Sequence, residues 1–131
     1  MIIKQLTVFL QNESGRLEEL TKVLAENSIN ISAISIAETE NYGIMRMIVS
    51  NHEKAMEALK EAGFTVKTTE VLSVECPDEP GSLHGALKIL LDEGIDISYM
   101  YGYSNGGTAR LIIKINNPEK GRELLEKHLQ S

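Results

Sequence analysis

Two short segments of the chain combine residue types that could bind both ends of a zwitterion. They read Asn12-Glu13-Ser14-Gly15-Arg16-Leu17 and Asp78-Glu79-Pro80-Gly81-Ser82-Leu83. Each begins with a side chain that can accept a hydrogen bond from an ammonium group, and each holds a glycine that lets the backbone approach a ligand closely. A helix that begins after the glycine would offer unpaired N–H groups and a positive dipole end to a carboxylate. The predicted chemistry is non-covalent recognition of a zwitterion.

The two segments are copies of each other within an internal repeat. Their glycines are 81 − 15 = 66 residues apart, and the same offset carries Asn51-His52-Glu53-Lys54 onto Asn117-Pro118-Glu119-Lys120. It also carries Asn30-Ile31 onto Asp96-Ile97, and we add these four residues to the candidate ligand site because Asn30 and Asp96 can accept from an ammonium group. The offset exceeds the roughly 20 to 50 residues of solenoid repeats. It therefore predicts two copies of one small globular unit, at residues 1–68 and 69–131.

Hydrophobic periodicity predicts the same elements in both copies. Alternating apolar residues from Ile2 and from Leu72 indicate half-buried strands, and a spacing of three to four from Leu17 and from Leu83 indicates amphipathic helices. Two alternating segments joined by a hairpin, and then a second helix, follow in each copy. The first copy ends in a last strand from Phe64, and the second copy has no residues for its counterpart.

The element order β-α-β-β-α-β predicts an α+β fold of two ferredoxin-like units, each an antiparallel sheet with both helices on one face. The second unit lacks its last strand, so that edge of its sheet is either covered by another strand or left open. Because apolar alternation runs without Gly or Pro from Phe64 to Cys76, we expect the last strand of the first copy to continue into the first strand of the second.

The helix-free faces of the predicted sheets carry apolar and aromatic side chains. These are Phe9, Ile44 and Ile48 in the first copy and Tyr99, Tyr101 and Tyr103 in the second. Such residues either cover a half-exposed sheet or form an interface. Together with the open edge of the second copy, they lead us to predict a homodimer, formed by edge pairing or by stacking of these faces.

Composition and charge exclude several classes of protein. The chain is 42 % hydrophobic and 24 % charged, which is typical of a soluble globular protein. A formal net charge of −6 disfavours nucleic acid as a partner, and no apolar run approaches the roughly 20 residues of a membrane span. Cys76 is the single cysteine, and residues 1–5 lack the features of a signal peptide, so we predict a reducing, cytoplasmic location.

No arrangement of residues points to catalysis. The three histidines, His52, His84 and His128, have no spacing typical of a metal site with Cys76 or with one another. Phosphate-binding, nucleophile-elbow and dinucleotide-binding motifs do not occur in the sequence. We therefore predict a protein that is not an enzyme and that uses neither a metal nor a cofactor.

The turn Asn/Asp-Glu-x-Gly-x-Leu, followed by Ile-Asn/Asp-Ile at the second strand, resembles the ACT domain of amino-acid-responsive regulatory proteins in both copies. The resemblance implies tandem ACT domains that bind an amino acid where two units meet and report its binding to a metabolic enzyme or a transcription regulator. Two alternatives stay open. One is a dissociable regulatory subunit that resembles the small subunit of acetolactate synthase, although the larger C-terminal portion of that family is absent. The other is an assembly module without a ligand.

Departures from the ACT pattern bear on the ligand. Leu10 and Cys76 stand where serine-sensing ACT domains resembling that of phosphoglycerate dehydrogenase carry a histidine, which disfavours serine, and Ser14 replaces the usual proline. We expect a small or branched apolar amino acid. The alternative for the turns is that Asn12 and Asp78 only cap their helices and that both glycines only serve tight turns.

Overall fold

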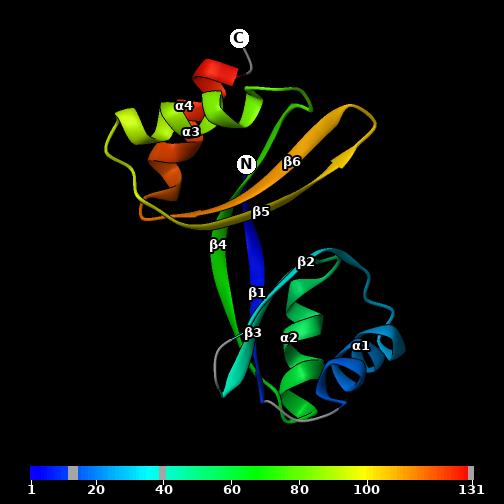
Figure 1. The fold of residues 1–131 in the computed structure, drawn as a ribbon. Helices are drawn as coiled ribbons and strands as arrows, with labels where there is room; N and C mark the ends of the chain where they lie inside the picture. The colour runs from blue at the N-terminus through cyan, green and yellow to red at the C-terminus, as the bar shows by residue number, and fades with distance from the viewer. Residues whose placement is uncertain (12–14, 39–40, 130–131) are drawn as a thin grey trace. The chain divides into compact units, whose positions relative to one another are not determined.

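The computed structural model describes residues 1–11, 15–38 and 41–129, and within them the predicted order of elements is confirmed. The elements are β1 (Ile2–Gln11), α1 (Arg16–Glu26), β2 (Ile31–Glu38), β3 (Tyr42–Val49), α2 (His52–Glu61), β4 (Thr65–Pro77), α3 (Ser82–Asp92), β5 (Ile97–Asn105), β6 (Thr108–Ile115) and α4 (Pro118–Leu129). The strands form a six-stranded antiparallel sheet in the order β2-β3-β1-β4-β6-β5 (Figure 1).

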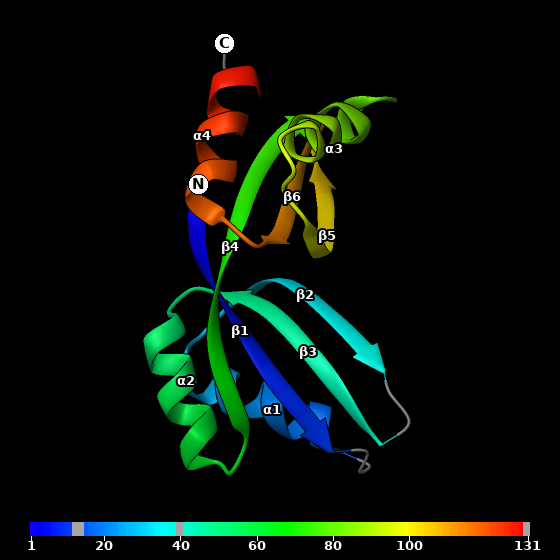
Figure 2. The same cartoon turned by 90° about the vertical axis from the view of Figure 1, so that its left-hand side faces the viewer.

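The chain divides into two compact units that share a strand. The N-terminal unit contains Lys4–Thr69, and the C-terminal unit contains Met1–Ile3 together with Glu70–Ser131. The 13-residue strand β4 therefore begins in one unit and ends in the other, as the long apolar alternation predicts (Figure 2). The limits of 1–68 and 69–131 drawn from the repeat stay a prediction about the two sequence copies.

The core of the N-terminal unit lies on one face of its strands, beneath α1 and α2. Leu6 of β1 pairs with Met47 of β3, and Val8 pairs with Met45. These residues are fully buried with apolar residues of the two helices, namely Leu20, Leu24, Ala55 and Leu59. Apolar residues recur at every second position along β1 and at every third or fourth position along α1. These two periods place them on one side of the strand and on one side of the helix.

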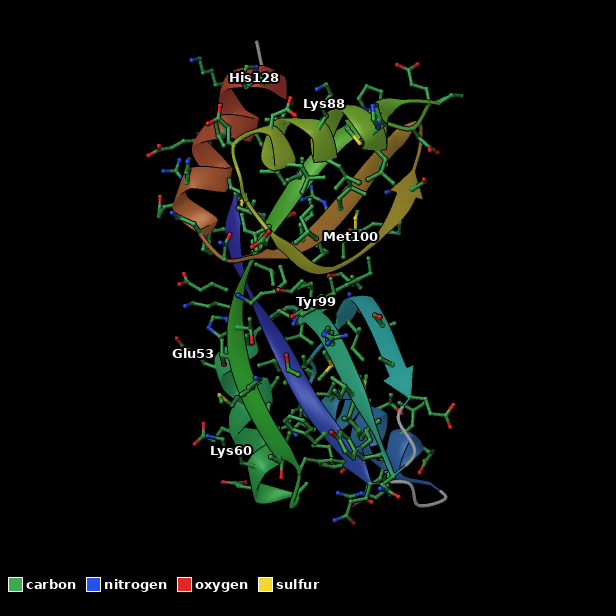
Figure 3. The ribbon with its side chains drawn as sticks, turned by 60° about the vertical axis from the view of Figure 1, so that its left-hand side comes forward. Glu53, Lys60, Lys88, Tyr99, Met100 and His128 are labelled. Carbon is green, nitrogen blue, oxygen red and sulfur yellow. The ribbon has the colours of Figure 1, made fainter. Side chains whose placement is uncertain are left out.

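The core of the C-terminal unit repeats this arrangement with β4, β6, α3 and α4. Leu72 of β4 pairs with Ile113 of β6, and Met100 of β5 lies on the other side of Ile113. Leu72, Ile113 and the helical residues Ala86 and Leu90 have no exposed surface. In Figure 3, Met100 lies on the side of β5 that faces α3 and α4, and Tyr99 lies on the opposite side, as the alternation of a strand requires.

The beginning of the chain covers the sheet edge for which the C-terminal unit has no strand of its own. The backbone nitrogen of Met1 donates to the carbonyl oxygen of Ser73 at 3.1 Å, and the nitrogen of Ser73 donates to the carbonyl oxygen of Met1 at 2.8 Å. Ile2 packs against the core of this unit. We predicted that this edge is either covered by another strand or left open, and at this point it is covered. An open edge here was one of our reasons for predicting a dimer, and that reason was wrong.

The shared faces predicted for the strand residues are confirmed by the register. Phe9 lies opposite Ile44 in the N-terminal unit. In the C-terminal unit Tyr101 lies opposite Ile112, and Tyr103 lies opposite Arg110. Exposure along this face is uneven, because Tyr103 is 40 % exposed and Ile112 only 1 %. Ile112 is covered because it lies on an inner strand between Tyr101 and Ser73.

Candidate ligand site at the strand-to-helix turns

The two turn glycines adopt a backbone conformation that other residues resist. Gly15 has φ 86° and Gly81 has φ 91°, and each directly precedes a helix. A Cβ built on either glycine would meet no atom within 4 Å among the described residues. The requirement for glycine therefore comes from the backbone, and the space above each turn is open. A side chain would cost roughly 1 kcal/mol or more through the dihedral alone.

Among the described residues, no side chain caps the helices that follow these glycines, in contrast to the other two helices. Gly15 and Gly81 are themselves the N-cap residues of α1 and α3 and make no side-chain hydrogen bond there. By comparison, Asn51 Oδ1 accepts from the nitrogen of Lys54 at 3.1 Å at the start of α2. Asn117 makes the corresponding bond to Lys120 in α4. The first-turn N–H groups of α1 and α3 are thus suited to an external acceptor.

The capping alternative does not explain Asp78, because the N-cap of α3 is Gly81. The backbone nitrogen of Asp78 donates to the carbonyl oxygen of Gly107 at 2.9 Å, which ties the turn to the β5–β6 hairpin. Ser82 donates from its backbone nitrogen to Glu79 at 3.2 Å. Asp78, Glu79, Pro80 and Gly81 are all exposed. Asn12, Glu13 and Ser14 of the first turn lie outside the described residues.

A pocket of about 360 Å³ adjoins the first turn. Its lining comes from the end of β1 and from the starts of β3, α1 and β4, and we call it the first-turn pocket. The lining residues are Phe9, Leu10, Gln11, Arg16, Asn41, Tyr42, Gly63 and Thr65. Ligand pockets commonly begin at about 300 Å³, so the volume suits one small molecule. Its walls combine aromatic rings with a cation, because Phe9 and Tyr42 have ring centroids 6.1 Å apart and Arg16 lines the same space.

Arg16 is held in place by two neighbours and retains an unused donor. Its guanidinium lies 4.0 Å from the ring centroid of Phe64, and its Nη1 lies 3.0 Å from Glu19 Oε2. Its Nε is buried and has no hydrogen-bond partner among the described residues. A buried donor without a partner is costly, and a ligand acceptor would remove that cost. The guanidinium therefore brings positive charge and hydrogen-bonding capacity to the first-turn pocket.

The hollow in the C-terminal unit lies away from its turn. It has a volume of about 350 Å³ and is lined by β4, β6 and α4. The arginines that line it already have hydrogen-bond partners within the protein. Arg110 donates to Ser73 and Glu75. Arg122 likewise bonds to Glu119 and Glu126, which raise the pKa of its guanidinium. We regard the first-turn pocket as the better candidate, because Nε of Arg16 has no hydrogen-bond partner in the part of the chain that the structure describes.

Asn30 and Asp96 do not join the turns within their own units. Asn30 follows α1, whereas Gly15 precedes it, and this helix of 11 residues is about 16 Å long. Asp96 follows α3 in the same way. Asn30 instead exchanges hydrogen bonds with Ser50, and Ile31 and Ile97 pack against the hydrophobic cores. Within each unit, Asn30 or Asp96 thus lies at the opposite end of the helix from the turn glycine, and its part in a ligand site stays a prediction.

Sequence reasoning placed Arg16 at the turn but missed its companions in the first-turn pocket. Phe9, Tyr42, Gly63 and Thr65 come from four separate segments, and no motif or spacing links them. Leu17 and Leu83, which follow the turns, are 41 % and 44 % exposed. These two leucines are not core residues, although their helical spacing predicted burial.

Two features of the described residues bear on thiol and metal chemistry. Cys76 is 6 % exposed, and burial together with the charge of Asp78 raises the pKa of its thiol, which disfavours the reactive thiolate. Among the described residues no group of His, Cys, Asp and Glu side chains could hold a metal ion. In the same part of the chain, no helix is both long and apolar enough to cross a bilayer.

Comparison with known proteins assigns the family. The ACT domain pair matches the chain over residues 1–131. The chain belongs to this family. An ACT domain pair is typical of ligand-binding regulatory domains, and ACT domains are regulatory and not catalytic. No curated protein matches the chain.

Solved structures share the fold over nearly the whole ACT domain pair. Protein BT0572 from Bacteroides thetaiotaomicron is 46 % identical with a TM-score of 0.93, and the match covers 97 % of this chain and 88 % of that one. The ligand-free regulatory subunit of aspartate kinase from Thermus thermophilus is 15 % identical with a TM-score of 0.69, covering 97 % and 96 %. The aspartokinase alpha and beta subunits match at 16 % identity and a TM-score of 0.62, covering 96 % and 95 %.

Proposed function

We propose that this ACT domain pair is an amino-acid-binding regulatory protein whose principal site is the first-turn pocket. The observation that carries the proposal is Arg16, whose buried Nε has no hydrogen-bond partner among the described residues and whose side chain lines a pocket of about 360 Å³. The start of α1 after the N-cap Gly15 supports it, because its N–H groups and dipole favour an anion at the same end of the helix.

The pocket chemistry suggests how an amino acid would be oriented. Arg16 and the first turn of α1 would bind its carboxylate, and Phe9, Leu10 and Tyr42 would contact an apolar side chain. Asn12 remains the proposed acceptor for the ammonium group. The second turn, with Asp78, Gly81 and Ser82, is proposed as a weaker site, because Ser82 stands in place of the arginine.

Thermal denaturation in the presence of each of the twenty amino acids tests the proposal. A ligand at 100 times its dissociation constant should stabilise the folded protein by about 2.7 kcal/mol and raise its Tm. We expect such a shift with an apolar amino acid. The absence of a shift with any of the twenty would contradict the proposed function and favour the alternative of an assembly module without a ligand.

Substitution of Arg16 tests the assignment of the pocket. In Arg16→Met the aliphatic part of the side chain is kept and the charge is lost. Since a hydrogen bond to a charged group contributes about 1.5 to 3 kcal/mol, we expect calorimetry to show affinity about 10- to 100-fold weaker. The matched control is Arg122→Met, because the Arg122 guanidinium is already bonded to Glu119 and Glu126 in the other unit. Equal affinities for the two variants would place the site elsewhere.

Substitution of the turn glycines distinguishes the two turns. Gly15→Asp adds both a strained dihedral and a negative charge where the carboxylate is proposed to bind, so binding should be lost in a protein that still folds by circular dichroism. Gly81→Asp should leave the principal site intact. Unaltered binding in both variants and in the double variant would show that neither turn binds the ligand.

A dissociable regulatory subunit is the second candidate. One observation favours it: the regulatory subunit of aspartate kinase from Thermus thermophilus shares the fold over 96 % of its own length. In this form the protein would bind a metabolic enzyme and change its activity when the amino acid binds. Assays of aspartate kinase and acetolactate synthase from the same cells, with and without the added protein, test this candidate.

We also propose that the protein is located in the cytoplasm and acts as a homodimer.

A further inference from the structure

Among the described residues, no strand covers the last part of one edge of β4. On this side β1 covers β4 as far as Met1, whose backbone exchanges two hydrogen bonds with Ser73. The strand β4 continues to Pro77, and on its other side it pairs with β6 over this whole length. At the usual rise of a strand, the four residues from Val74 to Pro77 span about 13 Å. We call them the uncovered stretch of β4.

The backbone groups of the uncovered stretch are placed as a further antiparallel strand would require. Along a strand inside a sheet, successive residues bond alternately to one neighbouring strand and to the other. Since Ser73 bonds to Met1, the N–H and C=O groups of Glu75 point to the same side. Pro77 points its carbonyl oxygen there too but has no N–H group. An added strand could therefore exchange two hydrogen bonds with Glu75 and donate a third to Pro77.

A groove beside the uncovered stretch would receive the side chains of an added strand. It is the hollow of about 350 Å³ described above, and all of its lining belongs to the C-terminal unit. Leu72 and Val74 of β4 and Leu125 of α4 form its apolar part. Figure 2 shows α4 beside the end of β4, on the side where the chain begins. Since the arginines that line the hollow are already bonded within the protein, it suits a peptide better than a small anion.

Charge favours a basic segment as the occupant. Residues 70–131 contain six Lys and Arg and ten Asp and Glu, so their formal charge is 6 − 10 = −4. The side chain of Glu75 is 58 % exposed and lies on the helix-free face, beside Arg110. A basic residue opposite Glu75 would lie on that face and form a stabilising pair of opposite charges. The residues on either side of it would face Val74 and Cys76 toward the core and should be apolar.

A second copy of the chain fits the uncovered stretch less well. Two such stretches would pair around a two-fold axis at Glu75, because Pro77 has no N–H group to donate. This axis would place two Glu75 side chains directly opposite each other, and like charges in that position are destabilising. The occupant that fits is therefore a segment of a different protein.

We propose that the uncovered stretch of β4 is a docking site for an extended, basic segment of a partner protein, which adds to the sheet as a strand antiparallel to β4. Main-chain hydrogen bonds supply affinity in such strand addition, and pockets for alternate side chains supply specificity. The proposal concerns the C-terminal unit and does not depend on an amino acid in the first-turn pocket. Loss of peptide binding and loss of amino-acid binding can therefore be measured separately.

Titration of the whole chain with a short peptide provides the first test. The probe is Lys-Thr-Val-Lys-Val with both ends blocked. In the proposed register its second lysine lies opposite Glu75, and its valines face Val74 and Cys76. We expect the NMR signal of the Glu75 amide to shift, and its hydrogen exchange to slow about tenfold when nine-tenths of the protein is bound.

Two control peptides separate backbone pairing from attraction between charges. N-methylation of the second lysine keeps its charge but removes the donor to the carbonyl oxygen of Glu75, so the modified peptide should bind about tenfold more weakly or worse. Glu-Thr-Val-Glu-Val keeps the backbone donors and the valines but opposes like charges, and it should also bind more weakly than the probe.

Charge reversal in the protein tests the same contact from the other side. Glu75→Lys should weaken binding of the basic peptide and strengthen binding of the acidic one. The matched control is Glu123→Lys, because Glu123 is an exposed residue of α4 that is not part of the groove lining. This control should keep the wild-type preference for the basic peptide. Circular dichroism should show both variants folded, and both should keep the wild-type affinity for the amino acid.

Three results would overturn the proposal. They are no binding of the basic peptide at millimolar concentration, equal binding of its N-methylated form, and NMR shifts confined to residues outside β4 and α4. A dimer of the chain that dissociates when the peptide binds would also overturn it, because the uncovered stretch would then belong to an interface between two copies.

Discussion

Glycine is required at different positions for different physical reasons, and the structure shows which reason applies at each position. Gly15 and Gly81 are needed for positive φ, and the space beside them is open. Gly102 is needed for packing, because a Cβ there would lie 2.5 Å from the carbonyl oxygen of Arg110. Gly85 has neither requirement: it lies on α3, and nothing is within 4 Å of the position of its Cβ.

This difference predicts opposite effects of the same substitution at two glycines. Gly102→Ala should lower the free energy of unfolding by about 1 to 3 kcal/mol, because backbone must move to make room. Gly85→Ala should raise it by up to about 1 kcal/mol, since alanine is the better helix former. Urea denaturation of the two variants measures both effects. Similar changes in the two variants would show that the crowding at Gly102 is relieved at little cost.

At the scale of elements, the first residues of β1 belong to the unit that ends the chain. Met1 and Ser73 exchange two backbone hydrogen bonds, and Ile2 packs against the core of the C-terminal unit. The sheet edge of that unit is completed by residues that are distant in sequence. Similarly, β4 supplies strand residues to both units.

This pairing predicts that substitutions in the N-terminal residues lower the stability of the C-terminal unit. Ile2→Asp should cost about 1 to 2 kcal/mol, because it places a charge against a partly buried apolar site. Hydrogen exchange should accelerate first at the amides of Ser73 and β6. Ile2→Val is the conservative control and should cost less than about 1.5 kcal/mol. Faster exchange confined to α1 and α2 would contradict this assignment of β1.

At the scale of the whole molecule, the two ACT copies have diverged in the residues that could bind a ligand. The first turn has Arg16 beside a pocket, and the second turn has Ser82 at the same repeat position. The edge strands have diverged as well, with exposed isoleucines on β2 and Met100 and Gly102 on β5. A duplicated unit has thus kept its fold in both copies while its surfaces have become different.

This divergence predicts one high-affinity amino-acid site per chain. Isothermal titration should give a stoichiometry near one, and Gly81→Asp should leave it unchanged. Gly15→Asp should remove the high-affinity site, because it alters the turn next to Arg16. Two equivalent sites per chain, or retention of the tight site in Gly15→Asp, would show that the arginine does not distinguish the two copies.

The sequence by itself determined the repeat, the order of elements and the positions of the turn glycines. These features are local: apolar periods of two and of three to four define strands and helices, and a glycine between a strand and a helix indicates positive φ. The continuous strand across the middle of the chain was predictable for the same reason, because the residues from Phe64 to Cys76 include no Gly or Pro. The ACT resemblance also followed from a local motif present twice.

Only the tertiary structure decided which distant segments meet. It paired Met1 with Ser73, gathered Phe9, Arg16, Tyr42 and Thr65 around the first-turn pocket, and placed Asn30 at the far end of α1 from Gly15. It also left Ile34 and Ile36 half exposed, although their spacing is that of core residues. Periodicity specifies which face of a strand is apolar, but the neighbours that cover that face depend on the path of the whole chain.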